Sequence, residues 1–211
     1  MKLKLFIAVL MAILVIYSAD AQQEGYLKNA YNAMQSKDYK SANDIYSKAI
    51  EQSATYAPNF YGRGLALFNL EKYQDATNDF KKAVDIDPNY HQALFSLGMS
   101  YIKIGQNDKA IDVLTKAIEL DKKTSDYYYT RGIANYWMKQ YSNAMNDYNK
   151  ALELNSNNGL AYYGRAILNK VQKQGSLALA DFEKYISLNG NKDGLQKDVE
   201  RMKMEIKDGR E

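Results

Sequence analysis

The stretch APNFYGRGLALFNLEKYQDATNDFKKAVDIDPNY, residues 57–90, decides the fold of this chain. Its apolar residues recur at steps of three and four, in one run on either side of a short polar turn. Such spacing places one apolar stripe on each of two helices. Pro88 ends the second helix because proline lacks a backbone N–H. The stretch therefore predicts a hairpin of two short helices, which cannot bury both of its stripes without neighbours of the same kind.

Copies of this hairpin occur along the chain at one constant interval. Each copy has an alanine where the first stretch has Ala76, and two copies also keep the glycine that stands at Gly64. We expect Ala76 to face Gly64, so that the two helices of a unit can approach closely. The corresponding alanines are Ala42, Ala110, Ala144 and Ala178.

A helix–turn–helix period of about 34 residues with small residues at fixed places is the signature of the tetratricopeptide repeat (TPR). The chain resembles that family over five units without an insertion, within residues 22–192. The resemblance implies an all-α fold, namely a right-handed superhelical solenoid of five helix–turn–helix units. The units are residues 23–56, 57–90, 91–124, 125–158 and 159–192.

The N-terminal segment, residues 1–21, is expected to lie outside the fold. Lys2 and Lys4 precede an unbroken apolar run over residues 5–17, and residues 19–21 read Ala-Asp-Ala. This order is typical of a secretory signal peptide with a cleavage site, and the run is shorter than the ~20 residues of a spanning helix. We expect cleavage before Gln22. An uncleaved N-terminal anchor is the alternative.

Residues 193–211 predict one further helix. Leu195, Val199, Met202 and Ile206 follow one another at helical spacing among charged residues. Such a helix has one apolar face, which suits it to cover the open end of a stack of repeats. We therefore expect a C-terminal amphipathic capping helix, with a partner-binding tail as the alternative.

Composition argues against several classes of function. The net charge is +3, and it falls to +2 without residues 1–21, which carry two lysines and one aspartate. That value is too near neutral to suggest nucleic-acid binding or an anionic membrane, so we expect membrane contact only through an uncleaved signal or a partner. The chain has no cysteine and a single histidine, His91. Because metal sites and nucleophilic triads need more such residues, we expect no enzyme activity, no cofactor and no metal.

Arginine and aspartate occupy two columns of the repeat alignment in some units and are both missing from the others. Three units carry an arginine in the first helix and an aspartate at a fixed spacing in the second. The third unit has Leu97 and Val113 instead, and the first has Asn29 and Ile45. Because the two columns switch together, we predict partly buried ion pairs that fix the register of the two helices. An arginine row that binds an anionic ligand is the alternative. The predicted pairs are Arg63–Asp79, Arg131–Asp147 and Arg165–Asp181.

The resemblance also implies where a partner would bind, because the first helices of tetratricopeptide repeats line a concave groove. In this chain the residues expected to face that groove are aromatic or aliphatic, which suits an extended peptide or a partner helix. The same side chains could instead pack between repeats. The candidate groove residues are Tyr61, Phe68, Phe95, Met99, Tyr129, Tyr136, Trp137 and Tyr163.

These observations favour an exported adaptor that binds another protein in its groove. The alternatives are a structural subunit of an envelope or secretion assembly that docks through its ends, and a protein that binds small molecules or glycans. Exposed Tyr129, Tyr136 and Trp137 would favour the adaptor, and a sealed groove with an apolar patch on the C-terminal helix would favour the subunit. The Lys-, Asn-, Tyr- and Ile-rich composition looks bacterial, so we expect the periplasm or the outer membrane periphery.

Overall fold

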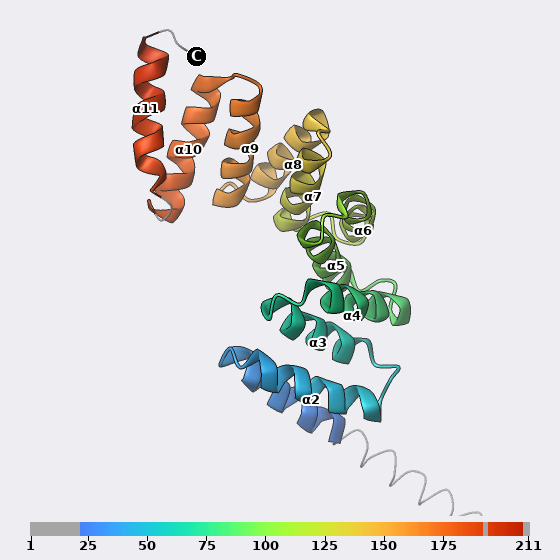
Figure 1. Ribbon diagram of the computed structural model, residues 1–211. Helices are drawn as coiled ribbons and strands as arrows, with labels where there is room; N and C mark the ends of the chain where they lie inside the picture. Colours follow the sequence, from blue (N-terminus) through green and yellow to red (C-terminus); the bar gives the residue numbers. More distant parts are fainter. Residues whose placement is uncertain (1–21, 192–193, 209–211) are drawn as a thin grey trace, which may run out of the picture. The chain divides into compact units, whose positions relative to one another are not determined.

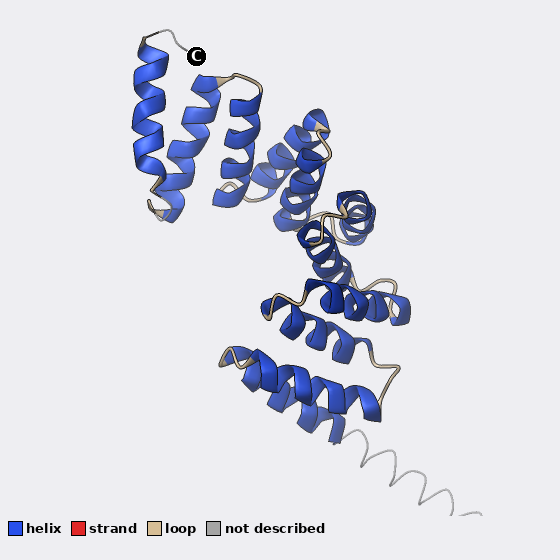
Figure 2. Ribbon diagram, viewed as in Figure 1, coloured by secondary structure: helices blue, strands red, loops and turns tan. Residues whose placement is uncertain are grey.

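The computed structural model describes residues 22–191 and 194–208, and the predicted signal peptide lies outside them. Within these ranges all regular secondary structure is helical (Figure 2). A helix over residues 22–35 comes first. The labelled helices that follow are α2 (Tyr39–Gln52), α3 (Ala57–Asn69), α4 (Tyr73–Ile86), α5 (His91–Lys103), α6 (Asn107–Leu120), α7 (Ser125–Trp137), α8 (Tyr141–Leu154), α9 (Gly159–Val171), α10 (Gly175–Asn189) and α11 (Leu195–Lys207) (Figure 1).

The helices follow the period of the sequence. The first helices of repeats two to five begin at Ala57, His91, Ser125 and Gly159, and each start lies one repeat period after the one before. The second helices keep the same interval from Tyr39 in α2 to Gly175 in α10. The predicted all-α fold of helix–turn–helix repeats is therefore confirmed.

Each turn inside a repeat has one residue in the left-handed backbone region. In the second repeat this residue is Glu71, whose N–H bonds to the carbonyl of Phe68 at 3.0 Å, while the N–H of Lys72 bonds to Leu67 at 2.9 Å. These two bonds form a Schellman motif, which satisfies the last carbonyls of α3. Four of the five residues are not glycine, so the turns hold a conformation that L-residues disfavour. The five are Lys37, Glu71, Gly105, Lys139 and Lys173.

The glycines of the first helices make room for rings of the second helices. A Cβ placed on Gly64 would lie 2.6 Å from Cε1 of Phe80, so the nearest side chain to Gly64 is Phe80 and not the expected Ala76. In the fourth repeat, the ring of Tyr148 would lie 2.7 Å from a Cβ on Gly132 and 2.9 Å from one on Gly164 of the next repeat. The ring of a second helix is thus held between two first helices.

The chain divides into two compact units, with the boundary inside α5 between Ser100 and Tyr101. In the first unit, Tyr46 packs with Ala30, Ala42 and Ala66 in one core cluster, and Phe60 is in a second. Neighbouring helices pack against each other in the order α2, α3, α4. This unit contains the second repeat with its Arg63–Asp79 pair.

In the second unit, helices α6 to α11 pack in chain order. Helix α11 lies beside α10 (Figure 1), and its Val199 and Met202 are buried in a cluster with Phe182. Leu195 packs against the same cluster. The apolar face of the C-terminal helix therefore covers the last repeat.

Candidate functional site

Three of the predicted groove tyrosines lie at the same position of their repeats and pack onto the second helix. Tyr61 stacks near Phe80 and Tyr90, with ring centroids 5.9 and 4.9 Å away. Tyr129 lies 6.1 Å from Tyr148. Burial is the main cause that raises the pKa of Tyr61, and it raises the pKa of Tyr129 to about 12. Both hydroxyls therefore lose their protons only at a higher pH than an exposed tyrosine does.

Tyr163 repeats this arrangement in the fifth repeat. Its ring lies 5.7 Å from that of Phe182 and 5.1 Å from that of Tyr185. Like Tyr61 and Tyr129, it is half-buried. The three tyrosines at this position therefore present only part of their surface to solvent, and none of them is a freely exposed side chain.

The remaining candidates differ mainly in exposure. Phe68, Phe95 and Met99 are half-buried, and Phe68 meets Tyr73 edge to face at 5.1 Å. Tyr136 is also half-buried, between Trp137 and Tyr141 at 5.6 and 5.9 Å. Trp137 stands apart from the other seven candidates because it is 62% exposed.

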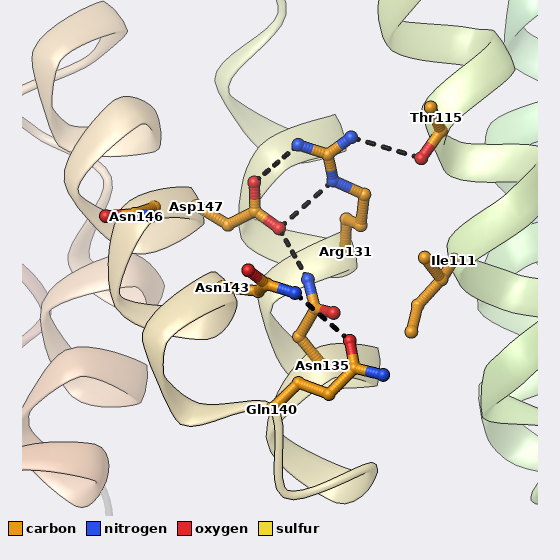
Figure 3. Close-up of a pocket in the computed structure, with 8 residues that line it drawn as sticks. All are labelled: Ile111, Thr115, Arg131, Asn135, Gln140, Asn143, Asn146 and Asp147. Carbon is orange, nitrogen blue, oxygen red and sulfur yellow. Dashed lines mark hydrogen bonds and ion pairs between the residues drawn. The ribbon is translucent and has the colours of Figure 1, made fainter.

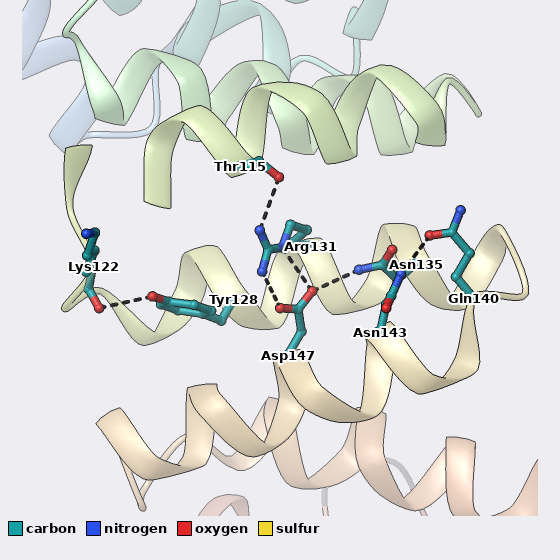
Figure 4. Close-up of polar contacts among 8 residues, drawn as sticks. All are labelled: Thr115, Lys122, Tyr128, Arg131, Asn135, Gln140, Asn143 and Asp147. Atoms are coloured by element: carbon teal, nitrogen blue, oxygen red, sulfur yellow. Dashed lines mark hydrogen bonds and ion pairs between the residues drawn. The ribbon is translucent and has the colours of Figure 1, made fainter. Parts of the chain in front are cut away.

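The arginine and aspartate columns come together in all three repeats that carry them. Arg131 donates from Nε and Nη2 to the two carboxylate oxygens of Asp147, at 3.0 and 2.7 Å (Figure 4). The pairs of Arg63 with Asp79 and of Arg165 with Asp181 are bidentate too, with distances of 2.7 to 2.8 Å. The aspartate side chains are nearly buried, at 6–8% exposure. Their position explains why each needs a fixed cation.

Each arginine makes a further bond that the two-column pattern did not predict. Its Nη1 donates to a side chain on the second helix of the preceding repeat. The third repeat, which has Leu97 instead of arginine, is preceded by Lys81 at the corresponding place. Three columns therefore change together. The acceptors are Ser47 for Arg63, Thr115 for Arg131 and Asn149 for Arg165.

The guanidinium groups also stack on aromatic rings one helical turn earlier. Arg131 lies 5.8 Å from the ring centre of Tyr128, and Arg165 lies 5.5 Å from that of Tyr162. The hydrogen bonds from Arg165 to Asp181 are the main cause that raises the pKa of Arg165. Each arginine is thus held in one orientation and keeps its positive charge, which the carboxylate of its aspartate partner balances.

Two of the three pairs carry a third polar group. Asn135 donates from Nδ2 to Oδ2 of Asp147 at 2.9 Å, and Asn169 donates to Asp181 at 3.3 Å. Both asparagines are 3% exposed. In the second repeat the corresponding residue is Leu67. The sequence offered a signal for this group, since Asn135 and Asn169 occupy the same position of successive repeats.

A pocket opens at each of the three ion pairs. The pocket at Arg131 has a volume of about 310 Å³ and lies between α6, α7 and α8 (Figure 3). Its copy at Arg165 has about 360 Å³, and the pocket at Arg63 has about 310 Å³. The first pocket is lined by Ile111, Thr115, Arg131, Asn135, Gln140, Asn143, Asn146 and Asp147.

Across the described residues, His, Asp and Glu form no group of three that could hold a metal ion. None of the helices in residues 22–191 and 194–208 is long and apolar enough to cross a membrane.

Comparison with known proteins supports the fold. A family model described as Regulator of microtubule dynamics protein 1-3 matches residues 69–142. No curated protein sequence matches this chain significantly.

Three solved structures illustrate the similarity. MamA from Desulfovibrio magneticus RS-1 is 22% identical with a TM-score of 0.73, and the match covers 81% of this chain and 97% of that one. YrrB, described as a TPR protein with an unusual peptide-binding site, is 20% identical with a TM-score of 0.68, over 83% and 90% of the two chains. PilF from Pseudomonas aeruginosa is 18% identical with a TM-score of 0.73, over 82% and 79%.

Proposed function

We propose that this chain, which has the tetratricopeptide-repeat fold, is a non-catalytic adaptor that binds a peptide or helix of another protein on its first helices. Solenoid repeats present extended surfaces for such partners. One solved structure of this fold is described as having a peptide-binding site. The observation that carries the proposal is the exposure of Trp137.

Trp137 has the properties of an interface anchor. It is the only tryptophan of the chain and is 62% exposed. Tyr136 fixes its ring from one side by an edge-to-face contact, and Met138 beside it is 43% exposed. Exposed tryptophans on a rigid support supply much of the binding energy in protein interfaces. The half-buried Tyr129 and Tyr163 would then form the wall against which a partner lies.

The proposal includes a place in the cell. The order of charged, apolar and small residues in 1–21 supports export, and the composition supports a bacterial source, so the adaptor would work in the periplasm or at the outer membrane periphery. Mass spectrometry of the exported protein tests this step. A mature chain that begins at Gln22 supports it, and a chain that retains residues 1–21 contradicts cleavage.

A second candidate is a structural subunit that docks through its ends. Two exposed apolar side chains near the ends favour it, Tyr31 at 61% and Met204 at 60% exposure. Tyr31 belongs to the helix over 22–35 and Met204 to α11. Such a subunit would not need Trp137 for assembly.

One experiment separates the two candidates. A photo-reactive amino acid is placed at position 138, 31 or 204 of the exported protein, and cross-linked partners are identified from the envelope. Position 138 lies beside the anchor and is 43% exposed, so Trp137 stays in place. The adaptor predicts a specific partner at 138 that Trp137→Ala weakens, and a shift of Trp137 fluorescence when the purified partner binds. Partners captured only at 31 or 204 would overturn the adaptor in favour of the subunit.

A further inference from the structure

The carbonyl oxygens of Asn135 and Asn169 are buried without a hydrogen-bond partner among the described residues. The orientation of each amide is determined by its neighbour. The aspartate beside it can only accept hydrogen bonds, so the NH₂ group must face the aspartate and Oδ1 must point away. A buried acceptor without a partner lowers the stability of the folded chain. Two repeats of one chain keep this cost at the same position.

Both asparagines line a pocket large enough for a donor group. The pockets of about 310 and 360 Å³ hold several heavy atoms more than a single water. In the first pocket the exposed side chains of Gln140 and Asn143 lie beside Asn135 and bond to each other at 3.2 Å (Figure 3). Rotation of this exposed pair would open Oδ1 of Asn135 to a ligand. Gln174 stands at the corresponding place of the second pocket.

The pockets are electrically balanced. Each contains one arginine and one aspartate in a bidentate pair. A carboxylate or phosphate that entered the pocket would be repelled by the aspartate, and an ammonium group would be repelled by the arginine. An uncharged ligand avoids both repulsions.

The hydrogen-bonding groups of the pocket that remain free are complementary to an amide. A guanidinium group has five N–H donors, and Arg131 uses three of them, two for Asp147 and one for Thr115. In the arrangement observed no side chain of the pocket donates to Asn135 Oδ1, and Arg131 has donors to spare. A primary carboxamide, with N–H and C=O in one plane, matches this pattern.

We propose that the pockets at Asn135 and Asn169 each bind one uncharged carboxamide, the group carried by asparagine and glutamine side chains. The site is separate from the groove aromatics and does not depend on the proposed adaptor function. The second repeat provides an internal control, because its pocket at Arg63 has the same ion pair but Leu67 in place of the asparagine.

The test titrates the isotope-labelled full chain with small probes and follows the arginine Nε–H and asparagine side-chain signals by NMR. Propionamide is expected to shift the signals of Arg131, Asn135, Arg165 and Asn169 saturably, with about millimolar affinity. The signal of Arg63 should stay unchanged. Propionate is the isosteric anion, N,N-dimethylpropionamide lacks the donor, and propanol carries a hydroxyl group, so all three should bind at least tenfold more weakly.

A matched pair of variants locates the site. Asn135→Leu and Asn169→Leu copy the natural Leu67, and each is expected to remove the shifts at its own pocket only. Helicity measured by circular dichroism checks that the variants fold. If they do not, the comparison among the four probes on the unaltered chain still decides.

Three outcomes would overturn the proposal. Absence of a saturable shift with propionamide would mean that water alone meets the two oxygens. Equal shifts at Arg63 would show that the asparagine does not matter. Equal binding of propanol or propionate would show that the site does not select carboxamides.

A peptide pair then identifies the source of the group. Acetyl-Gly-Gln-Gly-N-methylamide is compared with acetyl-Gly-Glu-Gly-N-methylamide, which differs only in the charged side chain; the N-methylated end carries no primary carboxamide of its own. Tighter binding of the glutamine peptide than of propionamide points to a polypeptide partner, and equal or weaker binding points to a free small amide. Tighter binding of the glutamate peptide would contradict the uncharged site.

Discussion

The hydroxyl oxygen of Thr115 accepts a hydrogen bond of 3.1 Å from Nη1 of Arg131, although the two residues belong to different repeats. The same arginine holds Asp147 in its own repeat. One guanidinium group therefore joins the second helix of one repeat to both helices of the next. Such contacts between neighbours are the interface terms that stabilise repeat proteins.

Breaking the pair at Asp147 should be costly, because Arg131 would remain as a largely buried charge. We expect Asp147→Val to lower the free energy of unfolding by about 3 kcal/mol. The triple variant Arg131→Leu/Asn135→Leu/Asp147→Val should regain most of this loss, since other repeats naturally have Leu97, Leu67 and Val113 at these positions. The change at Asn135 is included because this buried side chain would otherwise lose its acceptor. Urea denaturation followed by circular dichroism measures both variants. A triple variant as unstable as the single one would contradict this account.

The close approach of Tyr148 to Gly164 predicts a penalty for any side chain there. A Cβ on Gly164 would lie 2.9 Å from two ring carbons of Tyr148. We expect Gly164→Ala to reduce the free energy of unfolding by about 1–3 kcal/mol through overpacking. Gly25→Ala is the matched control, because nothing lies within 4 Å of its Cβ. That change should stabilise the helix over 22–35 by about 0.5–1 kcal/mol, and a loss in both variants would rule out overpacking as the cause.

The left-handed turn residue Lys139 should be improved by glycine. Its φ is 58°, and the corresponding residue in the third repeat is Gly105 with φ 76°. We expect Lys139→Gly to raise the free energy of unfolding by about 0.5–1 kcal/mol. The reverse change, Gly105→Lys, should lower it by a similar amount. Thermal unfolding of the two variants side by side checks the sign of each effect.

Half-buried tyrosines should make the fold sensitive to alkali. Burial is the main cause that raises the pKa of Tyr90 and of Tyr129 to about 12, from about 10 in the unfolded chain. Because the folded state holds these protons more tightly, the stability they provide is complete below pH ~10 and is lost as the pH rises toward ~12.

The measurement follows tyrosinate absorbance and the free energy of unfolding across this range. Tyr129→Phe removes one titrating group, so the loss of stability with pH should become less steep. A slope unchanged by this variant would show that Tyr129 does not contribute.

Much of the fold could be predicted from the sequence, because the repeat fixes the positions of the helices. The stripe of apolar residues, the alanine column and Pro88 place the helix boundaries of the second repeat, and the period carries them to its copies. The constant spacing between the arginine and aspartate columns, as from Arg63 to Asp79, also places the two groups on facing helices. The spacing of residues along the chain is therefore sufficient to place helices and side-chain columns where each unit packs against a copy of itself.

The exposure of the candidate site residues could not be predicted, because it depends on the direction in which each side chain points. The sequence could not show that Tyr129 lies half-covered over Tyr148 while Trp137 projects outward, since both suit either place. The bond between Arg131 and Thr115 did leave a signal, because a lysine replaces the acceptor where a leucine replaces the arginine. The expected pairing of Gly64 with an alanine missed that the glycine accommodates a larger ring.

The reach of each arginine into the preceding repeat has a consequence for how such chains can grow or be recombined. A segment cut at the start of α9 would carry Arg165 away from its acceptor Asn149. A segment cut before α8 would keep that bond but would separate Arg131 from Asp147, with which it makes two hydrogen bonds. The repeat therefore remains the better module for duplication or chimera design, but each transplanted repeat needs, on the second helix of its new neighbour, a side chain that can accept a hydrogen bond from its arginine.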